Sequence, residues 1–255
     1  MARSDTFLSG GVTGGGVLGA IGSWVYWLLV LEMWIVLTCL PTVAIVVLFG
    51  VGATTIPVLV LSLVFVGPPI AAALFAWRQR RLDDDMAPTR HFWRGYKLNW
   101  RDVLVWWAPL VVIAALLSIT LTNGDLYDGP RWMLAFSWAV LGLLALLSCP
   151  LLLLSAIFSF RLRDRFRLAA FVTVVRPLTT LGWIAIAVLA AAAALFLGDL
   201  WVLILASAFT LLASLNSMPV EALVMNRFVA SDEETEVSED DDETGDVAKD
   251  APTHQ

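Results

Sequence analysis

Long apolar blocks, separated by short polar stretches, make up most of this chain. An α-helix needs about 20 mainly apolar residues to cross the hydrocarbon core of a bilayer. Six blocks have that length, namely Trp24–Phe49, Thr55–Trp77, Val103–Leu121, Trp132–Phe160, Leu178–Leu197 and Leu200–Met225. The pattern therefore predicts an all-α polytopic membrane protein, a helical bundle of six transmembrane helices.

The joints between the blocks predict how they are arranged. Gly50-Val51-Gly52 joins the first block to the second, and Gly198-Asp199 joins the fifth to the sixth. Joints this short place consecutive helices antiparallel and side by side. The fourth block is longer than a crossing needs, so we expect it to tilt or to break near Pro150.

Three regions follow from this division of the chain. Residues 1–23 form a glycine-rich lead-in that we expect to be flexible, residues 24–230 the transmembrane domain, and residues 231–255 an acidic tail. A cleaved signal peptide is the rival interpretation of the start, because Val51-Gly52-Ala53 resembles a cleavage site. The apolar stretch before it is much longer than the roughly 7–15 residues of a signal core, which favours an uncleaved first span.

The distribution of Lys and Arg predicts the orientation. Cytoplasmic loops of membrane proteins are enriched in these residues. With the N-terminus inside, only Arg131 of the 16 Lys and Arg residues lies outside, next to the acidic Asp125 and Asp128. We therefore expect both termini to be cytoplasmic. The stretch after the fourth block is then a second cytoplasmic loop, which holds Arg161, Arg163, Arg165, Arg167 and Arg176.

Composition excludes an ordinary soluble domain. Hydrophobic residues make up 59% of the chain and charged residues 15%, against about 25% charged residues in soluble domains. The net charge of −6 arises in the tail, because half of the 22 acidic residues lie in Ser231–Gln255. The membrane body is therefore basic. The tail has too few apolar residues to fold alone, so we expect it to be disordered and solvated. Contact with the basic loops and repulsion from anionic lipid remain open alternatives.

The polar stretch between the second and third blocks combines cations with aromatic residues. Its members are Arg90, Phe92, Trp93, Arg94, Tyr96, Lys97, Asn99, Trp100 and Arg101. A helix starting at Pro88 would put aromatic residues on one face and cations on another. We predict an interfacial amphipathic helix, with its aromatics among lipid headgroups and Asn99 and Asp102 capping the next span. The cations either set the topology alone or dock a protein partner; nucleic-acid binding is not expected.

Three polar residues inside the apolar blocks are candidate intramembrane sites: Glu32, Asn216 and Glu221. Polar groups are costly in a membrane and commonly functional there. The two glutamates either face the bundle interior, where Arg78 or Arg176 would reach them, or extend to water from the helix ends.

Catalytic and metal-binding patterns are absent from the sequence. The histidines, His91 and His254, lie in a loop and in the tail, and Cys39 and Cys149 lie apart in apolar blocks. No His-Glu-x-x-His or Gly-x-Ser-x-Gly motif occurs. We therefore expect no enzymatic activity, no metal site and no cofactor.

Short motifs in the first half resemble the YesL-like family of bacterial integral membrane proteins of unknown function. The motif positions are Pro41 and Thr42, which follow Glu32, then Gly67 and Pro68, then Phe92-Trp93 with Asn99. Two features depart from the family pattern: Glu32 stands where Asn is usual, and Val43–Val66 separates motifs that the family joins closely.

The resemblance implies a location and a role. It implies a protein of the bacterial cytoplasmic membrane that acts as a non-catalytic accessory of a carbohydrate importer of the ABC class. Its partners would be the bilayer and importer subunits or another membrane complex. The alternative is a small-solute transporter or channel, motivated by Glu32, Glu221 and the proline- and glycine-interrupted spans.

Overall fold

The computed structural model describes residues 17–82, 86–123, 132–157 and 162–224. Within these ranges every regular element is a helix, so the all-α class is confirmed. The acidic tail, Arg131 and the first 16 residues lie outside the described part, and the predictions for them stay predictions.

The first apolar block contains two helices rather than one. Helix α1 (Val17–Thr38) is followed by α2 (Leu40–Phe49). Pro41 occupies the first turn of α2, where its missing N–H costs nothing because that donor has no intrahelical acceptor. The predicted lead-in was residues 1–23, but α1 already begins at Val17.

The second block is bent. Helix α3 (Ile56–Ser62) continues through the short 3-10 helix η1 (Leu63–Phe65) into α4 (Gly67–Leu82), with a bend of 41° at the break. The adjacent Pro68 and Pro69 at the start of α4 lack the N–H groups that would continue the helical ladder, which accounts for the bend.

Helix α5 (Pro88–Thr122) begins at Pro88 as predicted, but it runs without a break for 35 residues. The separate interfacial helix and the cap at Asn99 and Asp102 are therefore wrong, because the third span and the polar segment before it are one helix. Helix α6 (Trp132–Ile157) likewise continues through Pro150, where a break was an option.

The last third of the chain is more divided than its hydropathy predicts. The arginine-rich stretch assigned to a loop contains helix α7 (Leu162–Val175), and α8 (Pro177–Leu197) follows it. The sixth block is broken at Leu205 and Ser217. It forms the helices α9 (Asp199–Ile204), α10 (Ala206–Asn216) and α11 (Met218–Val224).

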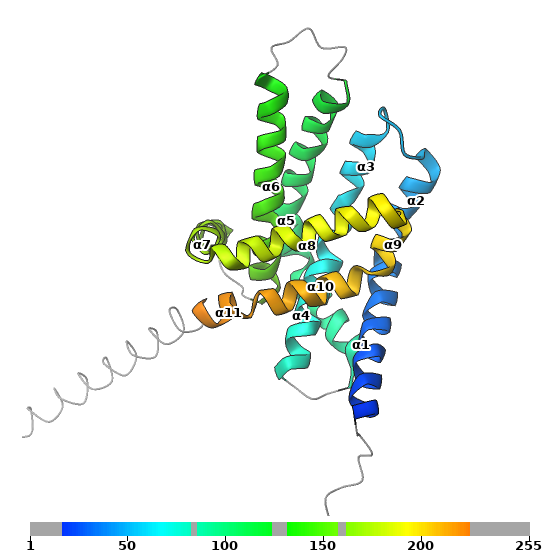
Figure 1. Cartoon of the computed structure of the whole chain (residues 1–255), viewed down its shortest axis with the longest axis vertical. Coiled ribbons are helices and arrows are strands. Elements are labelled where there is room, and N and C mark those ends of the chain that lie inside the picture. The colour runs from blue at the N-terminus through cyan, green and yellow to red at the C-terminus, as the bar shows by residue number, and fades with distance from the viewer. Residues whose placement is uncertain (1–16, 83–85, 124–131, 158–161, 225–255) are drawn as a thin grey trace, which may run out of the picture.

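Figure 1 shows two directions of helix packing. Helices α1, α5 and α6 run along the long axis of the view, whereas α8 and α10 lie across it. One core cluster gathers side chains of α4 to α8 and α10–α11 around Trp106 and Leu151, and another joins α1, α4 and α5 around Trp27 and Trp77.

Among the described residues, four helices are long and apolar enough to cross a membrane, or five if the bent pair of the second block counts as one span. They are α1, α5, α6 and α8. Leu195 and Phe196 of α8 leave 85% and 87% of their surface exposed. Apolar surface of this kind suits lipid, so the helices indicate a membrane-embedded protein.

Candidate functional site

A row of polar side chains follows one face of α10 and α11. It consists of Ser207, Thr210, Ser214, Ser217 and Glu221, and we call it the polar stripe. Alternating steps of three and four residues keep its members on one side of a helix. The four hydroxyl-bearing residues are buried, so the stripe faces protein.

Helix α4 binds the middle of the polar stripe. The indole Nε1 of Trp77 donates to the hydroxyl of Thr210 at 3.2 Å. Arg81 donates from Nη1 to the carbonyl oxygen of Ser214 at 3.1 Å and also contacts the hydroxyl of that residue. Buried polar groups need such partners, because an unpaired one costs about 1–3 kcal/mol.

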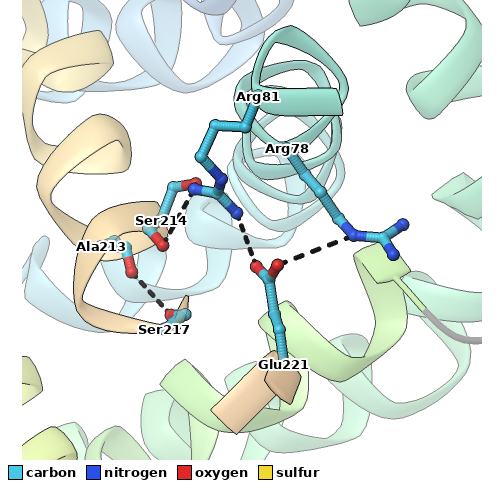
Figure 2. A network of polar contacts seen from close by, with 6 residues as sticks. All are labelled: Arg78, Arg81, Ala213, Ser214, Ser217 and Glu221. Carbon is cyan, nitrogen blue, oxygen red and sulfur yellow. Dashed lines mark hydrogen bonds and ion pairs between the residues drawn. The ribbon is translucent and has the colours of Figure 1, made fainter. Parts of the chain in front are cut away.

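Two arginines of α4 converge on the carboxylate of Glu221 (Figure 2). Nη2 of Arg81 lies 2.8 Å from Oε1, and Nε of Arg78 lies 3.7 Å from Oε2. The three side chains are only 17–22% exposed, so water screens the charges less than at an open surface. Arg78 was one of the two predicted partners of Glu221; Arg176 lies at the N-cap of α8 and is exposed.

Glu32 caps the first turn of α10. Its Oε2 accepts the backbone N–H of Ser207 at 2.7 Å, and the hydroxyl of Ser207 donates to the carbonyl oxygen of Leu28 at 3.0 Å. The first N–H groups of a helix lack intrahelical acceptors, so a carboxylate is stabilising there. The other oxygen, Oε1, is buried and has no hydrogen-bond partner among the described residues.

Asn216 points to a different neighbour. Its Nδ2 donates to the carbonyl oxygen of Thr179 in the first turn of α8 at 2.8 Å. A Cβ at Gly182 would overlap the Asn216 side chain, so the absence of a side chain at Gly182 permits this approach. The three candidate intramembrane residues therefore contact three different helices and do not form one cluster.

The contacts also fix how α10 and α11 cross α4. On α4 they involve residues 77–81, about one helical turn, whereas on α10 and α11 they extend from 210 to 221. At 1.5 Å per residue the second segment is roughly 17 Å long. The polar stripe therefore passes across α4 rather than along it, in agreement with Figure 1.

An ion pair and two hydrogen bonds connect α5, α6 and α7. The side chain of Arg165 is 4% exposed, and its Nη2 lies 2.8 Å from Oδ2 of Asp102. The hydroxyl of Ser155 accepts from Trp106 Nε1 at 3.0 Å and from Arg165 Nη1 at 3.5 Å. Sequence reasoning missed this pair, because Asp102 was expected at a helix cap and Arg165 in a loop.

Three aromatic residues of the predicted interfacial helix, Phe92, Trp93 and Tyr96, pack against other rings, whereas Trp100 is exposed. Phe92 is fully buried, and the ring of Trp34 on α1 lies 6.4 Å from Phe92 and 5.1 Å from Trp93, centroid to centroid. Tyr96 stacks on Phe92 at 6.3 Å. The expectation that these rings lie among lipid headgroups is therefore wrong for Phe92.

The polar members of that segment differ in exposure. Arg90, Arg94, Lys97 and Arg101 are exposed, whereas Asn99 is half-buried. Asn99 donates to the carbonyl oxygen of Ala156 at 3.5 Å, and the guanidinium of Arg101 lies 5.1 Å from the ring of Trp100. The four cations therefore lie on the exposed side of α5, and Trp100 lies there with them.

Three of the family-motif positions, Thr42, Gly67 and Pro68, lie at the bend between α3 and α4. The hydroxyl of Thr42 donates to the carbonyl oxygen of Ser62 at 2.9 Å, and Trp107 Nε1 donates to that of Leu63 at 2.9 Å. A Cβ on Gly67 would lie 2.6 Å from Cδ1 of Trp107. Pro68 is buried beside Gly67, whereas Pro41 is exposed. These positions stabilise a bent helix.

The arrangement holds helices together by polar contacts. Within the described ranges no three His, Cys, Asp or Glu side chains form a group that could hold a metal ion. The hydroxyls at 207, 210 and 214 were not identified from the sequence, although their spacing of three and four was a usable signal. Hydroxyl and other small side chains recur where membrane helices pack closely.

Comparison with known proteins gives one family. Residues 24–121 match the family described as Protein of unknown function, DUF624. The matched stretch starts in α1 and ends within the last turn of α5, so it contains Arg78 and Arg81 but not Glu221. No curated protein and no solved structure matches the chain. YesL is a member of the matched family, so this match agrees at family level with the resemblance noted in the sequence.

Proposed function

We propose that this chain is a non-catalytic accessory protein of the bacterial cytoplasmic membrane and belongs over its whole length to the family matched by residues 24–121. The family match and the motif residues at the bend of the second block support membership. The partner we propose, a carbohydrate importer of the ABC class, comes from the YesL-like resemblance.

One observation carries the non-catalytic assignment: ionisable side chains within the bundle contact other helices. Arg78 and Arg81 contact Glu221, and Arg165 contacts Asp102. A catalytic acid or base must reach a substrate atom within hydrogen-bond distance. Side chains engaged between helices are better suited to holding a scaffold, and a scaffold that binds another complex needs no reactive group.

Affinity purification tests the partnership. The tagged chain, extracted from its native membrane in a mild detergent, should recover a permease or ATPase subunit of an importer. A membrane protein of similar size with the same tag, expressed at the same level, serves as the control. Recovery of the chain alone, or of the same proteins with both baits, contradicts the proposal.

The proposed topology has six crossings with both termini in the cytoplasm. The Lys and Arg distribution supports it. In this arrangement α1 with α2, α3 with α4, α5 and α6 provide four crossings. The fifth and sixth would come from α8 and the chain α9–α11, which turn back on each other at Gly198, a glycine with a φ of 98°. Because α8 and α10 run across the direction of the other crossings (Figure 1), they would have to cross with a strong tilt.

A transporter or channel is the second candidate, and Glu32 favours it. Its buried Oε1 has no hydrogen-bond partner among the described residues, and such intramembrane carboxylates often belong to ion or proton paths. Purified protein in vesicles should then show a solute or proton flux that Glu32→Gln alters. Equal flux for the wild type, the variant and empty vesicles removes this candidate.

A further inference from the structure

The first turns of α5 carry a row of cations on their outer side. Arg94, Lys97 and Arg101 are exposed, and steps of three and four residues place them on one face. Phe92 and Gly95 on the other side are buried. These cations therefore point away from the helices that α5 packs against.

Helix α7 packs beside this row. The Arg165–Asp102 bridge holds α7 against the part of α5 that directly follows Arg101. Arg163 and Arg167 are exposed, but each lies two residues, about 200° of helix rotation, from Arg165, and so on the side of α7 away from this bridge. We call Arg94, Lys97 and Arg101 the basic surface. The neighbouring carboxylate of Asp102 pairs with Arg165, so the cations are in excess.

The last described helix ends near the same part of the protein. Helix α11 ends at Val224, and its Glu221 is held by Arg78 and Arg81 near the C-terminal end of α4. Only residues 83–87 separate α4 from the start of α5. A chain of the length of Ser231–Gln255 can extend roughly 80 Å, so its reach includes the basic surface.

We propose that the acidic tail, Ser231–Gln255, docks on the basic surface of its own chain. The tail holds half of the 22 acidic residues of the protein and one Lys, so the charges are complementary. Tethering raises the effective concentration of such a segment to about the millimolar range. The anionic cytoplasmic leaflet repels the tail, which leaves the cations of the protein as its favourable binding partner.

The lysine content of the chain allows a direct test. Lys97 and Lys249 are its two lysines, and a carbodiimide joins an amine to a carboxylate only when the two touch. The full-length protein in nanodiscs of neutral lipid should give a Lys97 crosslink to a carboxylate of the tail, identified by mass spectrometry. The yield should fall several-fold between about 50 mM and 500 mM salt, because ions screen the attraction.

Three variants make the test specific. Lys97→Arg keeps the charge but removes the amine, so it should abolish the crosslink. Arg94→Glu combined with Arg101→Glu should lower the yield several-fold. Arg176→Glu reverses an exposed cation outside the basic surface and should leave the yield unchanged. Equal yields from the Arg94/Arg101 and Arg176 variants overturn the proposal, provided both unfold at the wild-type temperature.

Two further results would also overturn it. In a mixture of heavy-isotope and ordinary protein, products that join the two forms would mean that the tail docks on a second copy. Loss of the crosslink when phosphatidylglycerol replaces part of the neutral lipid would assign the basic surface to lipid headgroups. Retention of the crosslink in both lipid mixtures, within single chains, supports the proposal.

Discussion

The Glu221 carboxylate contacts two guanidinium groups at once. Arg78 and Arg81 both point to it, so the three side chains together keep one positive charge in a half-buried place. Removing the anion from such a group costs more than the pair itself contributes, because the cations stay behind without a partner.

We therefore expect Glu221→Gln to lower the free energy of unfolding by about 1–3 kcal/mol, less than for a fully buried pair. Thermal unfolding of the purified protein in mild detergent measures this. Asp164→Asn, which neutralises an exposed carboxylate on α7, is the matched control and should change stability by at most about 0.5 kcal/mol. Equal effects of the two substitutions would mean that the Glu221 contacts contribute nothing.

Glu32 offers a comparison between two substitutions at one position. Glu32→Gln keeps an oxygen that accepts the N–H of Ser207, so its stability should stay within about 0.5 kcal/mol of the wild type. Glu32→Ala removes the cap of α10 and should cost about 1 kcal/mol. The same unfolding assay decides, and a Gln variant as unstable as the Ala variant would show that the fold needs the ionised carboxylate.

For individual residues, the sequence identified the polar side chains that are costly to bury in a membrane, but it did not identify most of their partners. Glu32, Asn216 and Glu221 stand out because they interrupt apolar blocks, and a pairing of Glu221 with Arg78 was among the possibilities. Arg81, Ser207 and Ser214 did not stand out. Arg81 and Ser214 become visible only when α10 is placed against α4, and Ser207 only when α10 is placed against α1. Both depend on packing between segments more than 120 residues apart.

Among the helices, the bend of the second block depends on a close contact. Gly67 at the start of α4 lies against the indole of Trp107, which donates to the carbonyl oxygen of Leu63 at the break. A helix bent by 41° needs donors for the carbonyls at its break, and Thr42 and Trp107 provide them.

Gly67→Ala should therefore destabilise the protein by about 1–3 kcal/mol, because the added methyl overlaps Trp107 and one of them must move. Gly142→Ala in α6 is the matched control: nothing lies within 4 Å of its added Cβ, so the better helix propensity of Ala should leave stability equal or higher. Thermal unfolding of the two variants side by side checks this. A fully stable Gly67→Ala variant would mean that Trp107 moves away at no cost.

Proline positions show what local sequence rules can and cannot predict about the helices. Pro88 starts α5, as the preference for proline in the first turn predicts. The fourth block was expected to tilt or to break near Pro150, and α6 has no break there; helices buried in a membrane protein tolerate an internal proline. The amphipathic α7 was missed because arginines alone suggested a loop.

For the whole molecule, hydropathy predicted the class of fold but not its packing. The all-α class follows from apolar length. The crosswise course of α8 and α10 does not, because it is set by contacts such as Asn216 with Thr179 and Trp77 with Thr210, which no periodicity within one segment reveals. The turn at Gly198 is therefore the position that best tests the topology.

Cysteine labelling of intact cells should locate this turn. In a background with Cys39 and Cys149 replaced by Ala, a membrane-impermeant maleimide should label Asp199→Cys from outside if six helices cross. Asn123→Cys, at the far end of α5, is the positive control, and Thr89→Cys, at its start, should react only after permeabilisation. Labelling of position 199 only after permeabilisation would leave α8–α11 on the cytoplasmic side of a four-span protein.

The polar stripe on α10 also limits how the sequence can change length. Each residue advances an α-helix by 100°, so one amino acid inserted within α10, between Ser207 and Thr210, would turn Thr210 and Ser214 together away from Trp77 and Arg81. An insertion of this kind removes several hydrogen bonds at once, whereas replacing one outward-facing Leu with another apolar residue removes none. We therefore expect the fold to tolerate amino-acid substitutions in this region far better than insertions or deletions.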